Sequence, residues 1–276
     1  MELRQSLSAY GLNEIMTYSF VSKEDVGNST LDIKDCLQIE NPLNSEQDLL
    51  RSSMVSSHLR AVSKNQKVEH NAFYEISRVY KSDDKSAKEQ WKLGITFWGD
   101  NSLLRLKGAI DQVLYSYRLD PEITRDLNNK LYYPNRSALL GSGFGAFGQI
   151  SQSVLDKFGI KKEVSFAELS IKDIIDSRMP IKVKEPIPYQ LVNKDISLEL
   201  GNMITFYEVR ACLKDLVSKV AFKQEFTSEE LDKSDSKRMT VSVELDLGPN
   251  PKSEDIQDII SKCSSICKQK LQAKVL

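Results

Sequence analysis

The stretch SRMPIKVKEPIPYQ, residues 177–190, divides the chain of 276 residues into two parts that we expect to fold separately. It holds three prolines and few large apolar side chains. Proline has a fixed φ and no backbone donor, so such a stretch continues neither a helix nor a central strand. We therefore predict a linker here, with one domain at residues 1–180 and a second at residues 187–276.

After the linker, the apolar pattern predicts short elements in the order β-α-β-β-α-β. In the strand at 238–248, Met239, Val241, Val243 and Leu245 alternate with polar residues, so only one side of this strand is apolar. Strands of this kind require both helices to cover the same face of one sheet. The order is that of the ferredoxin-like fold. The other predicted elements are a strand near 196–200, a helix at 204–219, a strand at 220–227, a helix at 253–271 and a closing strand at 272–276.

The part before the linker predicts a mixed α+β domain with antiparallel strands, because connections of hairpin length dominate it. The predicted strands lie at 14–22, 71–82, 91–100 and 164–171, and predicted helices lie at 2–10, 103–119 and 151–160. A further helix, capped by Ser45 or Asp48, is predicted to run through Leu49, Leu50, Met54, Leu59 and Val62.

The composition excludes some partners. Charged residues make up 28% of the chain, but the formal net charge is −1, so no bulk electrostatic attraction favours DNA or a membrane surface. Contacts with RNA would have to come from local basic groups, because phosphate neutralisation drives such binding. No apolar run approaches the ~20 residues of a membrane span, and the N-terminus lacks the apolar core of a signal peptide. We predict a cytoplasmic protein without a membrane partner.

Four cysteines and two histidines are the candidates for a metal site. Cys263 and Cys267 stand four residues apart, but both fall on the apolar stripe of a predicted helix, where cysteine behaves as a small hydrophobe. The only imidazoles, His58 and His70, lie in the other half of the chain and are predicted to be surface residues. We therefore predict buried cysteines and no metal ligands.

The stretch ALLGSGFGAFGQIS, residues 138–151, contains the spacing G-x-G-x-x-G. A dinucleotide-binding loop needs a helix that opens on the last glycine and an acidic residue further along the chain. Here Phe144, Phe147 and Ile150 give the glycine-rich stretch the character of a strand. A hairpin whose glycines allow positive φ and close backbone approach is favoured. Nucleotide binding is the weaker alternative, and calorimetry with ATP or NAD would test it.

Several segments resemble, in order along the chain, the C-terminal portion of the bacterial phenylalanyl-tRNA synthetase β subunit. The segments that carry this resemblance are GLNEIMTYSFVS (11–22), NPLNSEQDLLRSSM (41–54), FYEISRVY (73–80), PNRSALLGSGFGAFGQISQSVLDKFGI (134–160), VSFAELSI (164–171), IPYQLVNKDISLEL (187–200) and the terminal strand–helix–strand at 239–276. The full β subunit of that family is much longer, so the chain is either a fragment or a reduced subunit.

The resemblance implies an α+β fold: a class II synthetase-like antiparallel-sheet domain followed by a ferredoxin-fold anticodon-binding domain. The first domain would have lost its active site and would pack against a catalytic α subunit in an α2β2 assembly. The second would reach the anticodon region of tRNA(Phe). The whole enzyme, phenylalanine–tRNA ligase, would use ATP and Mg²⁺, with no cofactor in this chain. The chain alone is predicted to be inactive.

The residues agree with an inactive role. Class II enzymes place one arginine on a motif 2 strand and another after a glycine-rich motif 3 strand, where these arginines stabilise the charge of the reacting phosphates. Glu75 and Arg78 resemble the motif 2 strand, but Arg78 does not form the R-x-E pair. Gly148 and Gln149 stand where the second arginine would be, and the next arginine is Arg178 in the linker. No catalytic residue is predicted.

Basic and aromatic side chains of the second domain are the candidate tRNA contacts, because stacking and phosphate contacts hold single-stranded RNA. The tRNA candidates are Tyr189, Lys194, Phe206, Tyr207, Arg210, Lys214, Lys237 and Arg238. The acidic face of the strand at 238–248 indicates binding at strand edges and loops. It also motivates the alternative of a stand-alone ferredoxin-like scaffold or regulatory protein.

Candidate contacts with the α subunit are Arg51, Arg60 and Trp98. For Arg51 and Arg60, an exposed helix face in contact with solvent is an equal alternative. For Trp98, and also for Trp91, a place in the core or in an interface is favoured over a ligand-binding role.

Overall fold

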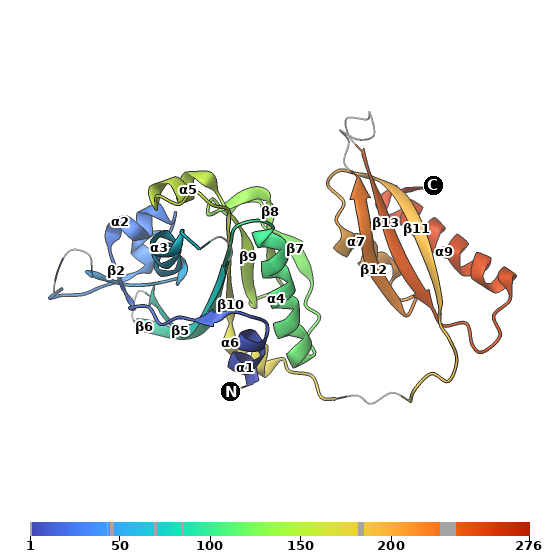
Figure 1. Cartoon of the computed structure of the whole chain (residues 1–276), viewed down its shortest axis with the longest axis horizontal. Coiled ribbons are helices and arrows are strands. Elements are labelled where there is room, and N and C mark those ends of the chain that lie inside the picture. The colour runs from blue at the N-terminus through green and yellow to red at the C-terminus, as the bar shows by residue number, and fades with distance from the viewer. Residues whose placement is uncertain are drawn as a thin grey trace. The chain divides into compact units, whose positions relative to one another are not determined.

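The computed structural model describes residues 2–42, 44, 47–68, 71–83, 86–181, 185–226 and 236–276. The chain divides into two compact units, Met1–Lys182 and Val183–Leu276 (Figure 1). Both units mix helices and strands, and all but one of the strand pairs are antiparallel. This confirms the predicted α+β class.

The first unit is built on a seven-stranded sheet with the strand order β1-β5-β6-β10-β9-β8-β7. Its strands are β1 (Asn13–Glu14), β5 (Asn71–Asp83), β6 (Ser86–Trp98), β7 (Ile123–Arg125), β8 (Tyr132–Leu140), β9 (Gly145–Ile150) and β10 (Val164–Ser170). Among the described strands of this sheet, only β1 and β5 pair in parallel. A second sheet of three short strands, in the order β2-β4-β3, holds β2 (Phe20–Val21), β3 (Leu37–Gln38) and β4 (Leu49–Leu50).

Helices cover both faces of the large sheet (Figure 1). One face packs on α1 (Glu2–Ala9), α4 (Ser102–Tyr117) and α6 (Ile171–Asp176), and the other packs on α3 (Val55–Asn65) and α5 (Gln152–Lys157). The small sheet packs with α2 (Lys23–Asn28) and the turn η1 (Ile33–Asp35). Successive side chains along each strand point to opposite faces of the sheet, so neighbouring residues pack into two separate cores.

Two predictions about local structure are wrong. The segment 14–22 is not one strand: β1 and β2 belong to different sheets. The helix predicted to include Leu49 and Leu50 begins only at Val55, because Leu49 packs into the small core beside β2. Asp48 pairs with Lys23 instead of capping a helix, and Ser45 lies outside the described residues.

The glycine-rich stretch is a hairpin, as predicted: β8 and β9 pair in an antiparallel manner. Gly145 has a φ of +139°, and a Cβ placed there would lie 2.1 Å from the backbone oxygen of Glu168 on β10. A Cβ at Gly148 would lie 2.8 Å from Cδ1 of Tyr132. These glycines therefore allow close approach of neighbouring strands and side chains.

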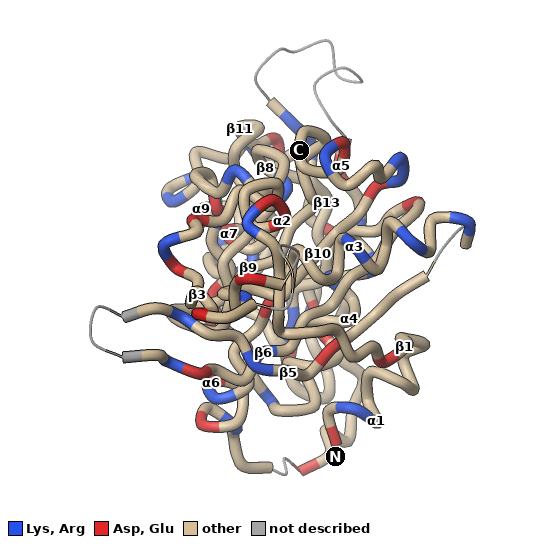
Figure 2. The backbone as a smooth tube through the Cα atoms, turned by 90° about the vertical axis from the view of Figure 1, so that its left-hand side faces the viewer, with Lys and Arg blue, Asp and Glu red and all other residues tan. Residues whose placement is uncertain are grey.

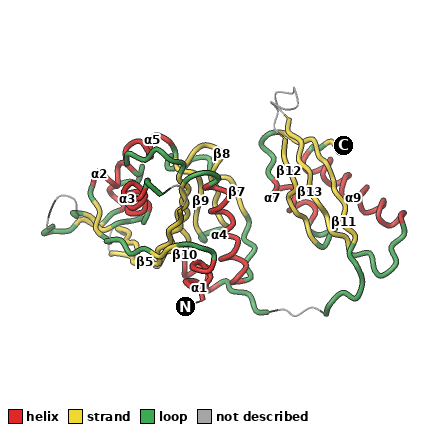
Figure 3. Tube along the Cα trace, in the orientation of Figure 1, coloured by secondary structure: helices red, strands yellow, loops and turns green. Residues whose placement is uncertain are grey.

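The second unit has the predicted β-α-β-β-α-β order (Figure 3). Its described elements are β11 (Val192–Gly201), α7 (Phe206–Leu213), β12 (Lys219–Phe226), β13 (Ser236–Leu245), α9 (Ser253–Leu271) and β14 (Lys274–Val275). The antiparallel sheet order β12-β13-β11-β14 is that of a ferredoxin-like fold. Residues of α7, α9 and the sheet share one apolar cluster, so both helices cover the same face.

The cysteines of α9 belong to this core, as predicted. Cys263 and Cys267 are fully buried. Burial raises the pKa of Cys267 to about 11, so the thiol stays protonated at neutral pH and packs as an apolar group.

We expect Gly145→Ala to destabilise the first unit by on the order of 3 kcal/mol, because the new methyl would meet backbone at an unfavourable φ. Gly27→Ala is the matched control, since Gly27 lies in α2 and a Cβ added there would have no atom within 4 Å; it should be neutral or slightly stabilising. Urea unfolding measures both. Equal stability of the two variants would contradict the close strand approach.

Candidate functional site

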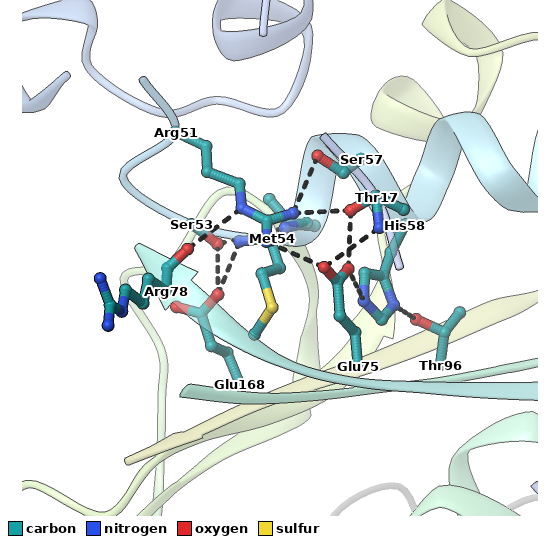
Figure 4. Close-up of polar contacts among 11 residues, drawn as sticks. Thr17, Arg51, Ser53, Met54, Ser57, His58, Glu75, Arg78, Thr96 and Glu168 are labelled. Atoms are coloured by element: carbon teal, nitrogen blue, oxygen red, sulfur yellow. Dashed lines mark hydrogen bonds and ion pairs between the residues drawn. The ribbon is translucent and has the colours of Figure 1, made fainter. Parts of the chain in front are cut away.

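A buried ion pair lies between α3 and the large sheet. Arg51 and Glu75 are 0% and 2% exposed, and Nη2 of Arg51 lies 2.9 Å from Oε1 of Glu75. Arg51 also donates to Oγ1 of Thr17 at 2.6 Å and to the backbone oxygen of Arg78 at 3.3 Å. Oγ1 of Thr17 in turn donates to Oε2 of Glu75 at 2.7 Å (Figure 4). The guanidinium therefore holds three separate segments of the chain together.

These contacts control the ionisation of Glu75. Burial alone would raise the pKa of this carboxyl, but His58, the Arg51 guanidinium and Thr17 together lower it from 4.5 to about 2. Glu75 is therefore a carboxylate throughout the neutral range, with hydrogen bonds at both oxygens. A carboxylate held in this way is a poor general acid, and its partners are the side chains of the fold itself.

His58 extends the cluster from α3 to the middle of the sheet. Its Nδ1 lies 2.7 Å from Oγ1 of Thr96 on β6, and its Nε2 lies 3.4 Å from Oε2 of Glu75. A Cβ on Gly94 would lie 2.9 Å from Nε2 of His58. Gly94 therefore leaves the space that the imidazole fills.

Glu168 on β10 forms a second polar contact on the same face. Gly94 pairs with Glu75 on one side and with Glu168 on the other, which places the two carboxylates in one row across the sheet. Oε1 of Glu168 accepts hydrogen bonds from Oγ of Ser53 at 3.0 Å and from the backbone N–H of Met54 at 2.7 Å. Because Met54 precedes α3, the carboxylate caps a helix that lacks a side-chain cap of its own.

Two predicted positions need correction, and a third is decided between its two alternatives. Arg51 is not on a helix face: it lies before α3, fully buried, so its guanidinium is not available to another subunit. Trp98 was predicted in the core or in an interface; it is 0% exposed and packs against Phe73, which places it in the core. His58 is buried and not on the surface, while His70 lies outside the described residues. Arg60 remains partly exposed on α3 and pairs with Asp25 of α2 at 2.5 Å.

The arginine of the motif-like strand does not face this cluster. Arg78 points away from Glu75 (Figure 4), pairs with Glu89 at 2.9 Å and lies over the ring of Trp91. Among the described positions of the central strands that share a face with Glu75 and Glu168, none is an arginine. Those positions include Asn71, Phe73, Ser77, Val79, Lys81, Lys88, Gln90, Lys92, Gly94, Thr96, Trp98, Ala146, Gly148, Val164, Phe166 and Ser170.

In the second unit, the predicted tRNA contacts do not converge. Lys194 is exposed near the start of β11. Arg238 on β13 lies opposite Glu199 in the strand register, nearer the end of β11. Tyr189 donates to Oδ1 of Asp246 at 2.8 Å, and this bond raises its pKa. Four of the remaining five lie together on one helix: Phe206, Tyr207, Arg210 and Lys214 come from α7 and its C-terminal cap.

Lys237, one of the predicted RNA contacts, has a side chain unsuited to that role. It is 7% exposed, and its ammonium pairs with Glu225 at 3.1 Å. Lys237 pairs in register with Leu200, which belongs to the core on the helix-covered face. The open face therefore holds Arg238 and excludes Lys237.

Along the described parts of both units, Lys and Arg are interspersed with Asp and Glu (Figure 2). No described helix combines the length and apolar character of a bilayer span. Within the described ranges, no three His, Cys, Asp or Glu side chains gather as metal ligands would.

Residues 1–171 match the family model described as the phenylalanyl tRNA synthetase beta chain CLM domain. The phenylalanine–tRNA ligase β subunit of Dehalococcoides mccartyi strain CBDB1 is 27% identical over 226 residues, which cover 75% of this chain and 28% of that protein. The β subunit of Fusobacterium nucleatum is 24% identical over 273 residues, which cover 88% of this chain and 34% of that protein. The chain thus spans about a third of these relatives.

Solved structures show the same fold. Pyrrolysyl-tRNA synthetase from Desulfitobacterium hafniense superimposes with a TM-score of 0.52 at 13% sequence identity, covering 63% of this chain and 67% of that one. The similarity assigns a class II synthetase-type fold to the part of this chain that it covers.

We expect Glu75→Gln to lower the stability of the first unit by about 3 kcal/mol at pH 7, because it leaves the buried guanidinium uncompensated. Since the pKa of Glu75 falls on folding, the stabilisation is present above pH 4.5 and is lost as the pH falls toward 2. Urea unfolding of both proteins between pH 2 and 7 should show their difference shrink in acid. Glu89→Gln, in an exposed pair of the same hairpin, should change stability by less than about 0.5 kcal/mol.

A difference between wild type and Glu75→Gln that stays constant down to pH 2 would contradict the ionised state assigned to Glu75.

Proposed function

Because the chain belongs to the family of the phenylalanyl-tRNA synthetase β chain CLM domain, we propose that it is a non-catalytic part of phenylalanine–tRNA ligase. Its first unit packs against a catalytic α subunit in an α2β2 assembly, and its second unit contacts the anticodon region of tRNA(Phe). The α subunit performs the aminoacylation, using ATP and Mg²⁺, in the cytoplasm.

One observation carries the non-catalytic role: a class II-type sheet whose central face holds structural contacts and no arginine at the described positions. Phosphoryl chemistry needs positive charge preorganised at the reacting phosphates. Here the guanidinium that contacts Glu75 on this face, that of Arg51, is buried and paired with that carboxylate. The contribution of this unit to the ligase therefore lies in its surfaces.

The segment between β1 and β2, together with Phe20 at the start of β2, provides a surface for the α subunit. Met16, Tyr18 and Phe20 are 94%, 76% and 43% exposed. They border a hollow of about 1030 Å³ that Arg60 also lines. Large exposed apolar side chains gathered beside a hollow are typical of a surface that another protein covers. We therefore propose that the α subunit contacts Met16, Tyr18 and Phe20 beside this hollow, and that Arg60 belongs to the same contact surface.

We expect the double substitution Met16→Ser/Tyr18→Ser to weaken the complex with the cognate α subunit roughly tenfold or more, because a few large side chains, tyrosine among them, carry most of the binding energy of an interface. Co-expression with a tagged α subunit, followed by titration of the purified partners, measures this. Leu127→Ser is the control, since Leu127 is 60% exposed and does not line the hollow. Full affinity in the double variant would overturn the placement, and no complex with wild type would overturn the proposed function.

For tRNA, the proposal relies on Arg238, Lys194 and the basic positions of α7 and its C-terminal cap. Arg238→Ala should weaken binding of tRNA(Phe). It should also reduce the magnitude of the slope of log K against log[salt] by the amount expected for the loss of about one phosphate contact. Lys237→Ala should leave the affinity unchanged and lower stability by about 1 kcal/mol, since Glu225 would lose its partner. Filter binding at several salt concentrations separates the two.

Equal loss of affinity in both variants would contradict the assignment of the open face. Failure of the wild-type chain to retain tRNA(Phe) above bulk tRNA would favour the alternative of a ferredoxin-like scaffold protein.

A further inference from the structure

The C-terminal ends of α3 and α5 lie side by side on one face of the large sheet (Figure 1). The side-chain amide of Gln66 joins them: it donates to the backbone oxygen of Gly159 at 2.9 Å and accepts from the backbone N–H of Lys161 at 3.0 Å. These contacts hold residues 60–68 against residues 157–162, so the side chains of both segments form one surface.

The two segments carry basic side chains and no carboxylate. Their basic residues are Arg60, Lys64, Lys67, Lys157, Lys161 and Lys162. The chain as a whole has a formal net charge of −1, so this concentration of one sign departs from the rest of the protein. In a chain without bulk positive charge, contacts with phosphate groups depend on local groups of this kind.

Four of the six basic side chains are exposed and form no ion pair with another described residue. Arg60 pairs with Asp25, and Lys162 donates to the backbone oxygen of Val68 at 2.9 Å. The exposed four, which we call the lysine patch, are Lys64, Lys67, Lys157 and Lys161.

The ends of the helices account for only half of the lysine patch. A lysine in the last turn of a helix is stabilised by the negative end of the helix dipole, as Lys64 is in α3 and Lys157 in α5. Lys67 and Lys161 stand beyond the two helices, where this stabilisation has fallen off. Their charges add to the repulsion within the patch, which a bound anion would relieve.

The surroundings of the lysine patch are polar, which favours a nucleic acid over other anionic partners. Within residues 60–68 and 157–162, all of which the structure describes, Val68 is the single large apolar side chain that is exposed. A membrane-binding surface places several large apolar side chains beside its lysines. A protein interface relies on aromatic or aliphatic anchors. A nucleic-acid backbone needs neither, because it is held through its phosphates.

The same residues favour a duplex over a single strand. Single-stranded RNA is held by aromatic side chains on which its bases stack. Phe158 is the one aromatic residue of the two segments, and it is buried. A duplex keeps its bases stacked inside and presents its phosphates and sugars to the protein.

We propose that the lysine patch binds the phosphate backbone of an RNA duplex without reading its sequence. The four ammonium groups act as point charges on the phosphates and contact no base edge. The choice of RNA over DNA rests on the proposed function, in which the second unit contacts tRNA(Phe). The first unit then has an RNA-binding surface of its own, which holds a base-paired stem.

The test is filter binding of the 276-residue chain to a short RNA duplex of arbitrary sequence, which has no anticodon loop, at several salt concentrations. Lys64→Gln/Lys67→Gln and Lys157→Gln/Lys161→Gln should each weaken binding roughly tenfold at low salt. Each should also reduce the magnitude of the slope of log K against log[salt] by the amount expected for about two phosphate contacts. Circular dichroism should show both variants folded, because the four ammonium groups have no ion-pair partner to lose among the described residues.

Lys34→Gln/Lys172→Gln is the matched control, because it removes the same number of positive charges. Both lysines are exposed, and Lys172 lies on α6, which packs on the opposite face of the large sheet. This variant should bind the duplex nearly as well as the wild type does.

Failure of the wild-type chain to bind the duplex would overturn the proposal. So would equal affinities of the control and the two lysine-patch variants, or binding of phosphatidylserine vesicles in place of the duplex. The duplex carries no feature specific to tRNA(Phe), so these outcomes are separate from the preference for tRNA(Phe) and from complex formation with an α subunit, on which the proposed function depends.

Discussion

The contact between Arg51 and Glu75 is the constraint on which the first unit depends. It joins the segment before α3 to the second strand of the large sheet, and through Thr17 it fixes the chain between β1 and β2. A buried charge pair of this kind gains little over an apolar pair, but losing either partner is costly. The pair therefore specifies how three distant segments meet, and the position of α3 and of the exposed segment around Met16 follows from it.

This arrangement also explains why a synthetase-type sheet can act without chemistry of its own. Glu75 is hydrogen bonded at both oxygens, and Glu168 uses Oε1 to cap α3. Arg78 lies away from the cluster, with Glu89 and Trp91. Side chains that stabilise a reacting substrate need hydrogen-bond donors or acceptors directed at that substrate. Here most of the donors and acceptors on this sheet face already bond to other residues of the protein. What remains for partners is the exposed apolar segment, the mixed surface of the ferredoxin-like unit and the lysine patch.

The sequence predicts well the elements whose signal is local. The alternation in β13, the hairpin around the glycines and the buried stripe of α9 all depend on residues a few positions apart. Sequence reasoning misplaces Arg51 and His58 because their burial depends on Glu75 and Thr96, 24 and 38 residues further along the chain, and no local pattern encodes such pairs. Lys237 is a different case. It stands two and four residues before Met239 and Val241 on the same strand, so the alternation pattern itself predicts that Lys237 lies on the sheet face that the helices cover.

The proposed function requires that the chain support aminoacylation through its surfaces and perform no activation itself. Phenylalanine-dependent exchange of pyrophosphate into ATP tests this, with the chain alone, with the cognate α subunit alone and with both together. We expect no exchange by the chain alone and a higher rate with both partners than with the α subunit alone. Exchange by the isolated chain, or a rate for the α subunit that the chain does not change, would disprove the proposed function.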